Sequence, residues 1–240
     1  GAGISGILAA KNAAKNNFKT LLVDEKNELG GSTIYENNEF NKIDNKAPSE
    51  WLKKEIEELK NIKNLEIKTR TSVAAYHQYN YLLARENLTD HLEAKDKTNK
   101  IRQRLLKIRA KKVILATGAL ERPLIFNNND RPGIMLSSAI KKYSEFYGVA
   151  CGSKNVFFTN NDSAYESAIS LYNKGINVEA IIDIREQSES KIVKKVKEAG
   201  IKIYWSHSIV DTTGYKRLNS ISIMKLSNDG TSVTGSKISI

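Results

Sequence analysis

The stretch that decides the fold opens the chain as Gly1-Ala2-Gly3-Ile4-Ser5-Gly6 and closes as Leu21-Leu22-Val23-Asp24-Glu25. Glycines at its first, third and sixth positions allow a tight turn, a close approach of backbone to a ligand and close packing of the next helix. That helix begins within the turn, so its unpaired N–H groups and positive dipole end favour an anion there. The spacing predicts a site for the diphosphate of an adenine dinucleotide, formed by Gly1, Gly3, Ile4, Ser5 and Gly6.

The acidic pair Asp24-Glu25 ends the second apolar run, about 20 residues after the turn, where a carboxylate can accept hydrogen bonds from a ribose diol. The spacing does not decide which of the two does so. Glycine-rich turns also occur at strand-to-helix junctions that bind nothing. Two further features favour the nucleotide: four alanines give the helix a small-residue face, and Gly30, Gly31 and Ser32 follow the acidic pair. We expect these three residues to line the same site.

Both ends of the chain suggest a longer polypeptide. A glycine turn of this kind follows a β-strand, yet the sequence starts at its first glycine without an initiator Met. The last residues, 235–240, resemble part of a strand. We therefore expect the fold to be truncated at both ends.

The composition narrows the classes of partner. The net charge is +11, but 29 lysines against 9 arginines are spread along the chain, which favours a solvated basic surface over nucleic-acid binding. No apolar run approaches the roughly 20 residues that span a bilayer, so we expect no membrane partner. Cys151 is the single cysteine, which excludes a redox dithiol within these residues and fits a cytoplasmic setting. The three histidines lack partners at ligand spacing, and we predict no metal site.

The middle of the chain returns to the same site. After a polar loop over 32–48, the pattern predicts a helix from Pro48, strands at 65–69, 72–77, 81–86 and 104–109 in a small β-meander, and an exposed turn over 87–103. A fully buried strand is expected over 112–119. It closes in Ala116, Thr117 and Gly118, whose small side chains suit a strand end that abuts a nucleotide.

A second alternation of strands and helices follows. Helices are expected at 137–147, 163–173 and 190–199, and strands at 155–159, 178–184 and 201–205. Where three glycines would be expected, the sequence has 160–165, Asn-Asn-Asp-Ser-Ala-Tyr, and Asp162 would repel a diphosphate. The fold class is therefore α/β, with two Rossmann-like units in a glutathione-reductase-like arrangement. We expect a first domain over 1–130 with the meander and a second, degenerate and incomplete domain over 131–240.

Several blocks outside the glycine turn resemble the α subunit of heterotetrameric sarcosine oxidase. The resemblance covers at least residues 1–185. It is carried by 79–82, 102–110, 116–123, 128–136 and 159–165, which read YNYL, RQRLLKIRA, ATGALERP, NNDRPGIML and TNNDSAY.

The resemblance implies a flavoprotein oxidoreductase that acts on a CH–NH group, demethylating sarcosine to glycine with oxygen and tetrahydrofolate. In that family the α subunit holds NAD, FMN lies at the α–β interface and FAD belongs to the β subunit. It implies NAD between Gly1, Gly3, Gly6, Asp24 and Glu25, with Ala116 to Gly118 at its edge. The implied partners are the β subunit, the smaller γ and δ subunits, an amine substrate and folate. The family's folate-binding domain is absent from these residues, and we predict no catalytic residue among them.

Three alternatives stay open at this point. The first site could hold FAD in a pyridine-nucleotide oxidoreductase whose second unit passes hydride, although the sequence at 160–165 opposes nucleotide binding there. Opine-oxidase and cyanide-synthase subunits share parts of the architecture. A scaffold protein with an empty fold is the third.

Overall fold

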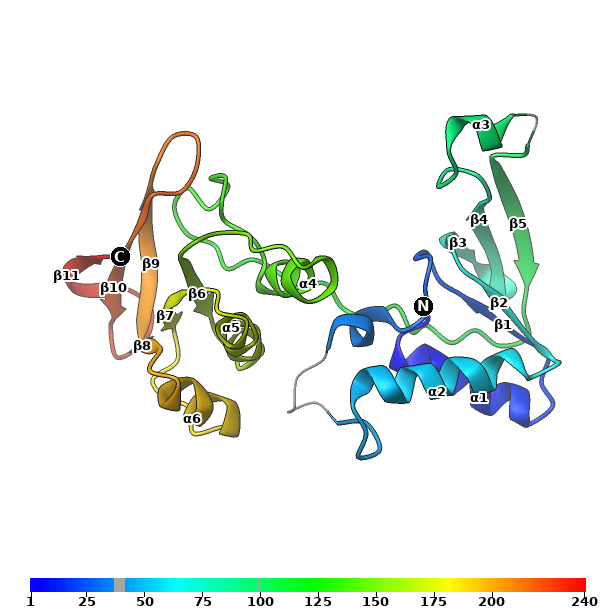
Figure 1. The fold of residues 1–240 in the computed structure, drawn as a ribbon, viewed down its shortest axis with the longest axis horizontal. Coiled ribbons are helices and arrows are strands. Elements are labelled where there is room, and N and C mark those ends of the chain that lie inside the picture. The colour runs from blue at the N-terminus through cyan, green and yellow to red at the C-terminus, as the bar shows by residue number, and fades with distance from the viewer. Residues whose placement is uncertain (37–41, 99) are drawn as a thin grey trace. The chain divides into compact units, whose positions relative to one another are not determined.

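The computed structural model describes residues 1–36, 42–98 and 100–240, which form two compact units, Gly1–Ala119 and Leu120–Ile240 (Figure 1). This boundary precedes the expected division at 130/131 because the connector makes its contacts within the second unit. The Glu121 carboxylate accepts the backbone N–H groups of Ser137 and Ser138 at 3.0 and 2.7 Å.

The first unit is built on a parallel strand pair, β1 (Thr20–Val23) and β2 (Leu65–Lys68). Helix α1 (Ile4–Lys15) precedes β1, and α2 (Pro48–Lys60) precedes β2. Proline at the first position starts α2, as expected from the sequence. One core cluster of this unit consists of buried side chains from these elements, from the glycine turn and from the segment after β1: Ala2, Ile7, Ala10, Leu22, Leu29, Trp51, Leu52 and Leu59.

An ion pair cluster joins the two helices. Lys11 Nζ lies 2.6 Å from Glu55 Oε2 and 2.8 Å from Glu58 Oε2. Its contacts raise the pKa of Lys11 against the opposing effect of burial, and the Lys11 hydrogen bond lowers the pKa of Glu58 to about 2. The cluster fixes α2 against α1 and so holds the helix whose start forms the glycine turn.

The β-meander is confirmed. Strands β3 (Thr71–His77), β4 (Tyr81–Asn87) and β5 (Gln103–Arg109) form an antiparallel sheet in that order. The turn η2 (Gln78–Asn80) joins β3 to β4, and the single-turn helix α3 (Ala94–Lys97) lies within the expected exposed turn. The expected polar loop contains the 3-10 helix η1 (Gly31–Tyr35), while its residues 37–41 lie outside the described ones.

The expected buried strand over 112–119 is wrong. These residues have no strand partner among the described elements, and Ile114 and Leu115 are 67% and 68% exposed. An apolar run of this kind becomes a buried strand only where neighbouring strands pair with it on both sides. The sheet that the run would join contains only β1 and β2 in the described part of the chain.

The second unit repeats the alternation on a parallel sheet. Strands β6 (Asn155–Thr159), β7 (Val178–Asp183) and β8 (Lys202–Trp205) pair in order, with α5 (Ser163–Asn173) and α6 (Lys191–Glu198) between them. Helix α4 (Ser137–Tyr147) precedes β6 and ends at Gly148 in the left-handed conformation. The predicted bounds of α4 and α5 are confirmed, and Ser190 caps α6.

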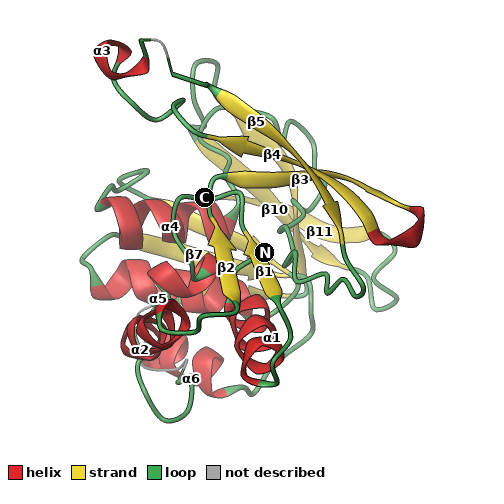
Figure 2. Ribbon diagram, turned by 90° about the vertical axis from the view of Figure 1, so that its right-hand side faces the viewer, coloured by secondary structure: helices red, strands yellow, loops and turns green. Residues whose placement is uncertain are grey.

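A second antiparallel sheet completes this unit (Figure 2). It contains β9 (His207–Thr213), β10 (Ser220–Leu226) and β11 (Val233–Ser239), of which the sequence predicted only a strand-like run at the end. Ile209, Ile221 and Ile223 pack with Ile182 of β7 into one core cluster. The mixed α/β class with parallel and antiparallel sheets is thus confirmed.

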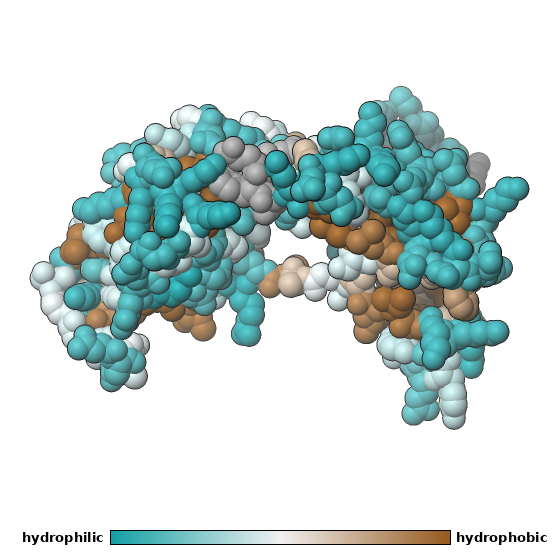
Figure 3. All heavy atoms as spheres, turned by 90° about the horizontal axis from the view of Figure 1, so that it is seen from below, coloured by the Kyte–Doolittle hydropathy of each residue, from teal (hydrophilic) through white to brown (hydrophobic). Residues whose placement is uncertain are grey.

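The surface agrees with the charged composition. On the face that Figure 3 shows, hydrophilic side chains predominate and apolar ones form smaller groups. No described helix has both the length and the apolar character needed to cross a membrane.

Candidate functional site

Backbone atoms leave no room for a side chain at two positions of the glycine turn. A Cβ at Gly1 would overlap the carbonyl oxygen of Ala116, and a Cβ at Gly6 would overlap the carbonyl oxygen of Gly1. Both residues must therefore be glycine for the turn to pack as it does.

Gly3 is different, because neither its backbone conformation nor the packing of the described residues around it requires glycine. It has φ −72° and ψ −175°, an extended conformation open to any residue, and a Cβ there would meet no atom of the described part of the chain within 4 Å. Gly3 is also the N-cap of α1, without a side-chain cap. The N–H groups of Ile4, Ser5 and Gly6 in the first turn have no carbonyl partner within the helix. The turn thus presents unpaired donors beside an open space, which fits an anion.

The two acidic residues after β1 have different environments. Asp24 is buried, and its carboxylate accepts the backbone N–H of Ala2 at 2.5 Å and that of Lys26 at 2.8 Å. These bonds fix the glycine turn to the end of β1. Glu25 is exposed. Asp24 is therefore a positioning residue for the turn, and Glu25 is the carboxylate accessible to a ligand.

The segment Gly30 to Ser32 packs against the turn. The N–H of Gly30 donates to the carbonyl of Ala2 at 2.7 Å. Gly31 has φ +60°, and a Cβ there would lie 3.0 Å from the Cα of Gly3. Ser32 is exposed on η1. The structure therefore brings this segment beside Gly3, as the sequence predicted.

The segment Ala116 to Gly118 approaches from the other side. A Cβ at Gly6 would lie 3.4 Å from the Ala116 Cβ, and a Cβ at Gly1 would lie 3.5 Å from the Thr117 Cα. Gly118 is exposed, with φ +74°. Although the expected strand is not formed, its small residues still lie beside the turn.

These residues together fit a diphosphate flanked by a ribose. The donors at the start of α1 would face the diphosphate, and Glu25 would accept from the ribose hydroxyls. Within the described residues, no group of three or more His, Cys, Asp or Glu side chains is arranged to hold a metal ion.

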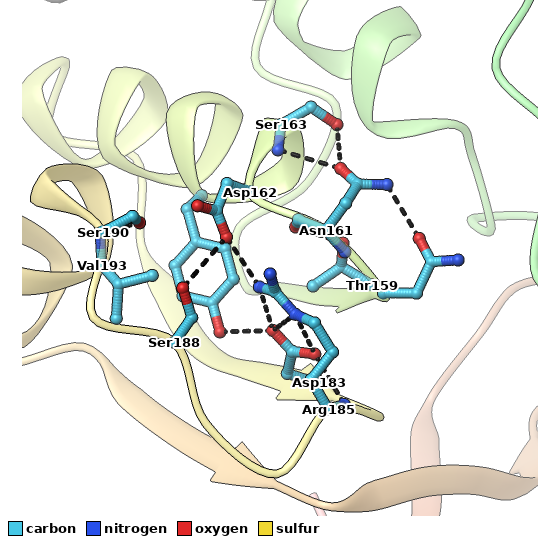
Figure 4. A network of polar contacts seen from close by, with 11 residues as sticks. Thr159, Asn161, Asp162, Ser163, Asp183, Arg185, Ser188, Ser190 and Val193 are labelled. Carbon is cyan, nitrogen blue, oxygen red and sulfur yellow. Dashed lines mark hydrogen bonds and ion pairs between the residues drawn. The ribbon is translucent and has the colours of Figure 1, made fainter.

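The corresponding turn of the second unit is filled by side chains (Figure 4). The Asn161 amide oxygen accepts the Ser163 N–H at 2.9 Å at the start of α5. Arg185 Nη2 lies 2.7 Å from carboxylate oxygens of both Asp162 and Asp183. The Ser163 N–H, one of the donors that a diphosphate would use, is thus already engaged, and Arg185 is paired with two carboxylates.

A buried network supports this closed turn. Tyr165 donates its hydroxyl to Asp183 at 2.8 Å, and both side chains are fully buried. Burial is the main cause that raises the pKa of Tyr165, and the hydrogen bond to Asp183 raises it further. The hydrogen bond to Asp183 also raises the pKa of Arg185. Burial alone would raise the pKa of Asp162, but hydrogen bonds from Ser190 and Arg185 hold it below its usual value.

Sequence reasoning missed several of these contributors. Ala2 anchors the first turn through both backbone groups, which no side-chain pattern signals. The partnership of Tyr165, Asp183 and Arg185 joins distant positions. A hint was available in Asp183, a carboxylate that ends an otherwise apolar strand.

Comparison with known proteins agrees with this geometry. The family model described as pyridine nucleotide-disulphide oxidoreductase matches residues 1–239. The chain belongs to this family. The solved structures that share the fold of this chain include the following two. Thioredoxin reductase from T. acidophilum has a TM-score of 0.69 at 18% identity and aligns with 100% of this chain and 71% of its own. L-proline dehydrogenase from P. horikoshii has a TM-score of 0.61 at 21% identity, and the match covers 96% of this chain and 38% of that protein's chain.

Two curated relatives of this chain are named sarcosine oxidase subunit alpha. The protein from Corynebacterium sp. (strain P-1) is 36% identical over 231 residues, which are 95% of this chain and 24% of the relative. The protein from Rhizobium meliloti (strain 1021) is 32% identical over 236 residues, which are 96% of this chain and 24% of the relative. The resemblance seen in the sequence is confirmed. The chain spans about a quarter of the length of these relatives.

Proposed function

We propose that the first unit binds an adenine dinucleotide, NAD, in a protein similar to sarcosine oxidase subunit alpha. Gly3 carries this proposal. Neither its backbone conformation nor the packing of the described residues requires glycine there, so the missing side chain leaves room for a ligand. The adjoining N–H donors at the start of α1 favour an anionic ligand in that space.

The residues that would hold the nucleotide have distinct tasks. The N–H groups at the start of α1 bind the diphosphate, and Glu25 accepts hydrogen bonds from the adenosine ribose. Gly30, Gly31 and Ser32 border the nucleotide on one side, and Ala116, Thr117 and Gly118 on the other. Asp24 keeps the turn in place. When bound, NAD supplies a hydride-accepting ring, but the described residues near the turn hold no candidate for moving a proton to or from a substrate.

The second unit takes a structural part in this proposal. Asp162 places negative charge at the start of α5, and Arg185 is already paired with two carboxylates. A second nucleotide would have to displace these contacts. This argues against hydride transfer between two bound nucleotides in one chain, as a self-contained flavin reductase would require.

For the whole protein we infer oxidative demethylation of sarcosine to glycine with oxygen and tetrahydrofolate, in a cytoplasmic heterotetramer. The name shared by the curated relatives supports this substrate and the presence of further subunits, which we propose to be β, γ and δ. An FMN at the interface with the β subunit belongs to the same proposal. An opine-oxidase-like subunit is the alternative for the substrate.

Analysis of the released nucleotide tests the assignment. Purified full-length protein is denatured, and the supernatant is examined by absorption and mass spectrometry. NAD has no band at about 450 nm, whereas flavins do. NAD near one molecule per chain is the expected result. Because other cofactors of a complex contribute flavin, the comparison is made with a Gly3→Val variant, and the nucleotide that this variant lacks is the one held at the turn.

A further inference from the structure

The β3–β4 hairpin ends in a strained, exposed tyrosine. Tyr79 has φ +59° and ψ +33°, in the left-handed region that bulky residues avoid, and it is 83% exposed. Glycine or asparagine would relieve the strain at such a position. A costly conformation that leaves the ring largely exposed to solvent indicates a function for the side chain.

The hairpin tip, residues 77–81, is held rigidly by Asn80. The side-chain oxygen of Asn80 accepts a hydrogen bond from the Tyr76 hydroxyl at 2.6 Å, and the side-chain amide of Asn80 donates one to the Lys111 carbonyl at 3.0 Å. The Asn80 carbonyl also accepts the Ala110 N–H at 3.1 Å. Figure 2 shows this turn as a short helical segment at the end of the three-stranded sheet. The ring of Tyr79 is therefore presented from a fixed support, which lowers the entropic cost of inserting it into a partner.

The surroundings of the hairpin tip are basic. Residues 70–85 and 97–120 contain no Asp or Glu. Arg109 lies over the ring of Tyr81 at 5.2 Å, and Lys111 and Lys112 follow at the end of β5. An exposed aromatic within a ring of cations fits an apolar pocket bordered by carboxylates. The hairpin tip of a second copy of this chain would present the same cations, so it would be repelled.

We propose that the hairpin tip is a docking surface for a different polypeptide, with Tyr79 inserted into an acidic-rimmed pocket of that partner. This rests on the proposed subunit character of the whole protein and is independent of the nucleotide. A nucleic acid is disfavoured because only Tyr79 is largely exposed at this end of the hairpin: the neighbouring Tyr76 is 52% exposed and its hydroxyl is bound to Asn80, whereas strand-binding proteins offer a row of free stacking platforms.

The test uses the full-length protein purified in its native complex. Tyr79→Gly removes the ring and relieves the backbone strain. We expect the dissociation constant for the partner chain to rise at least tenfold, while the melting temperature of the isolated protein stays equal or rises. Tyr79→Phe should assemble as the wild type does. Tyr215→Ala removes a tyrosine that is 92% exposed in the other unit and should leave assembly unchanged.

Two results would overturn the proposal. One is Tyr79→Gly protein that assembles with the wild-type dissociation constant, or whose melting temperature falls. The other concerns a photoreactive benzoyl-phenylalanine at position 79 in the purified complex: a crosslink to nucleic acid, to this chain itself, or to nothing contradicts the assignment. A crosslink to an Asp- and Glu-rich segment of another chain supports it. Nucleotide content, measured in the same samples, should be unchanged, so failure here is separate from failure at the glycine turn.

Discussion

Gly3→Val should remove the nucleotide without unfolding the protein. The conformation of Gly3 is open to valine, and a Cβ there meets no atom of the described residues within 4 Å, so the Cβ itself adds no clash with them. The main loss is the poorer N-cap preference of valine, about 1 kcal/mol. For a protein of this size, that lowers the melting temperature by about 2 to 4 °C.

The effect on binding should be much larger. The valine side chain would fill the space next to the first N–H groups of α1. Hydrogen bonds to a charged group contribute about 1.5 to 3 kcal/mol each, so losing two weakens binding by about 3 kcal/mol or more, which is over 100-fold. We expect the purified variant to contain almost no nucleotide of the wild-type kind.

The assay combines nucleotide release with thermal unfolding, and two further variants calibrate it. Gly152→Val lies in the second unit, where a Cβ meets its nearest atom at 3.6 Å, and should change neither quantity much. Gly6→Ala should lose nucleotide and also stability, by about 1 to 3 kcal/mol, because its Cβ overlaps the Gly1 carbonyl. Full nucleotide content in folded Gly3→Val protein would refute the reasoning.

Four other substitutions test the remaining contacts. Glu25→Gln should weaken nucleotide binding by about 1.5 to 3 kcal/mol with an unchanged melting temperature, whereas Asp24→Ala should lower the stability itself by about 1 to 3 kcal/mol because it leaves buried N–H groups unpaired; calorimetry and urea unfolding separate the two, and equal melting losses would contradict the assignment. The pKa of Glu58 falls from 4.5 to about 2 in the folded protein, so its stabilising effect is complete above pH 4.5 and is lost as the pH falls toward 2. Lys11→Met should therefore remove the decrease in melting temperature that protonation of Glu58 causes below pH 4.5. An unchanged pH dependence of the melting temperature would show that the Lys11–Glu58 pair is not responsible for it. Arg185→Met leaves two carboxylates without their cation and should cost about 3 to 5 kcal/mol in urea unfolding; a loss under about 1 kcal/mol would show that the network is not needed for stability.

Local patterns predicted most of the elements. The bounds of α4 and α5 followed from helical spacing, and β3, β4 and β5 followed from alternation between turn residues. The expected strand over 112–119 failed because burial of an apolar run depends on strands beside it, which its own residues do not encode. The sheet of β9, β10 and β11 was missed although β10 alternates between serine and apolar residues over much of its length.

The candidate site shows the same division between local and distant information. The glycine positions could be read from spacing, because a missing side chain has local consequences. The choice between Asp24 and Glu25 could not, since it depends on whether backbone donors of Ala2 and Lys26 reach one carboxylate. The pairing of Arg185 with Asp162 likewise became visible only once β7 and α5 were placed together.

The most direct test of the central claim is the nucleotide content of the full-length wild-type protein beside its Gly3→Val variant. We predict about one NAD per wild-type chain and a loss of that NAD alone in the folded variant, with any flavin retained. The absence of NAD from both proteins, or the loss of FAD in place of NAD, would contradict the account.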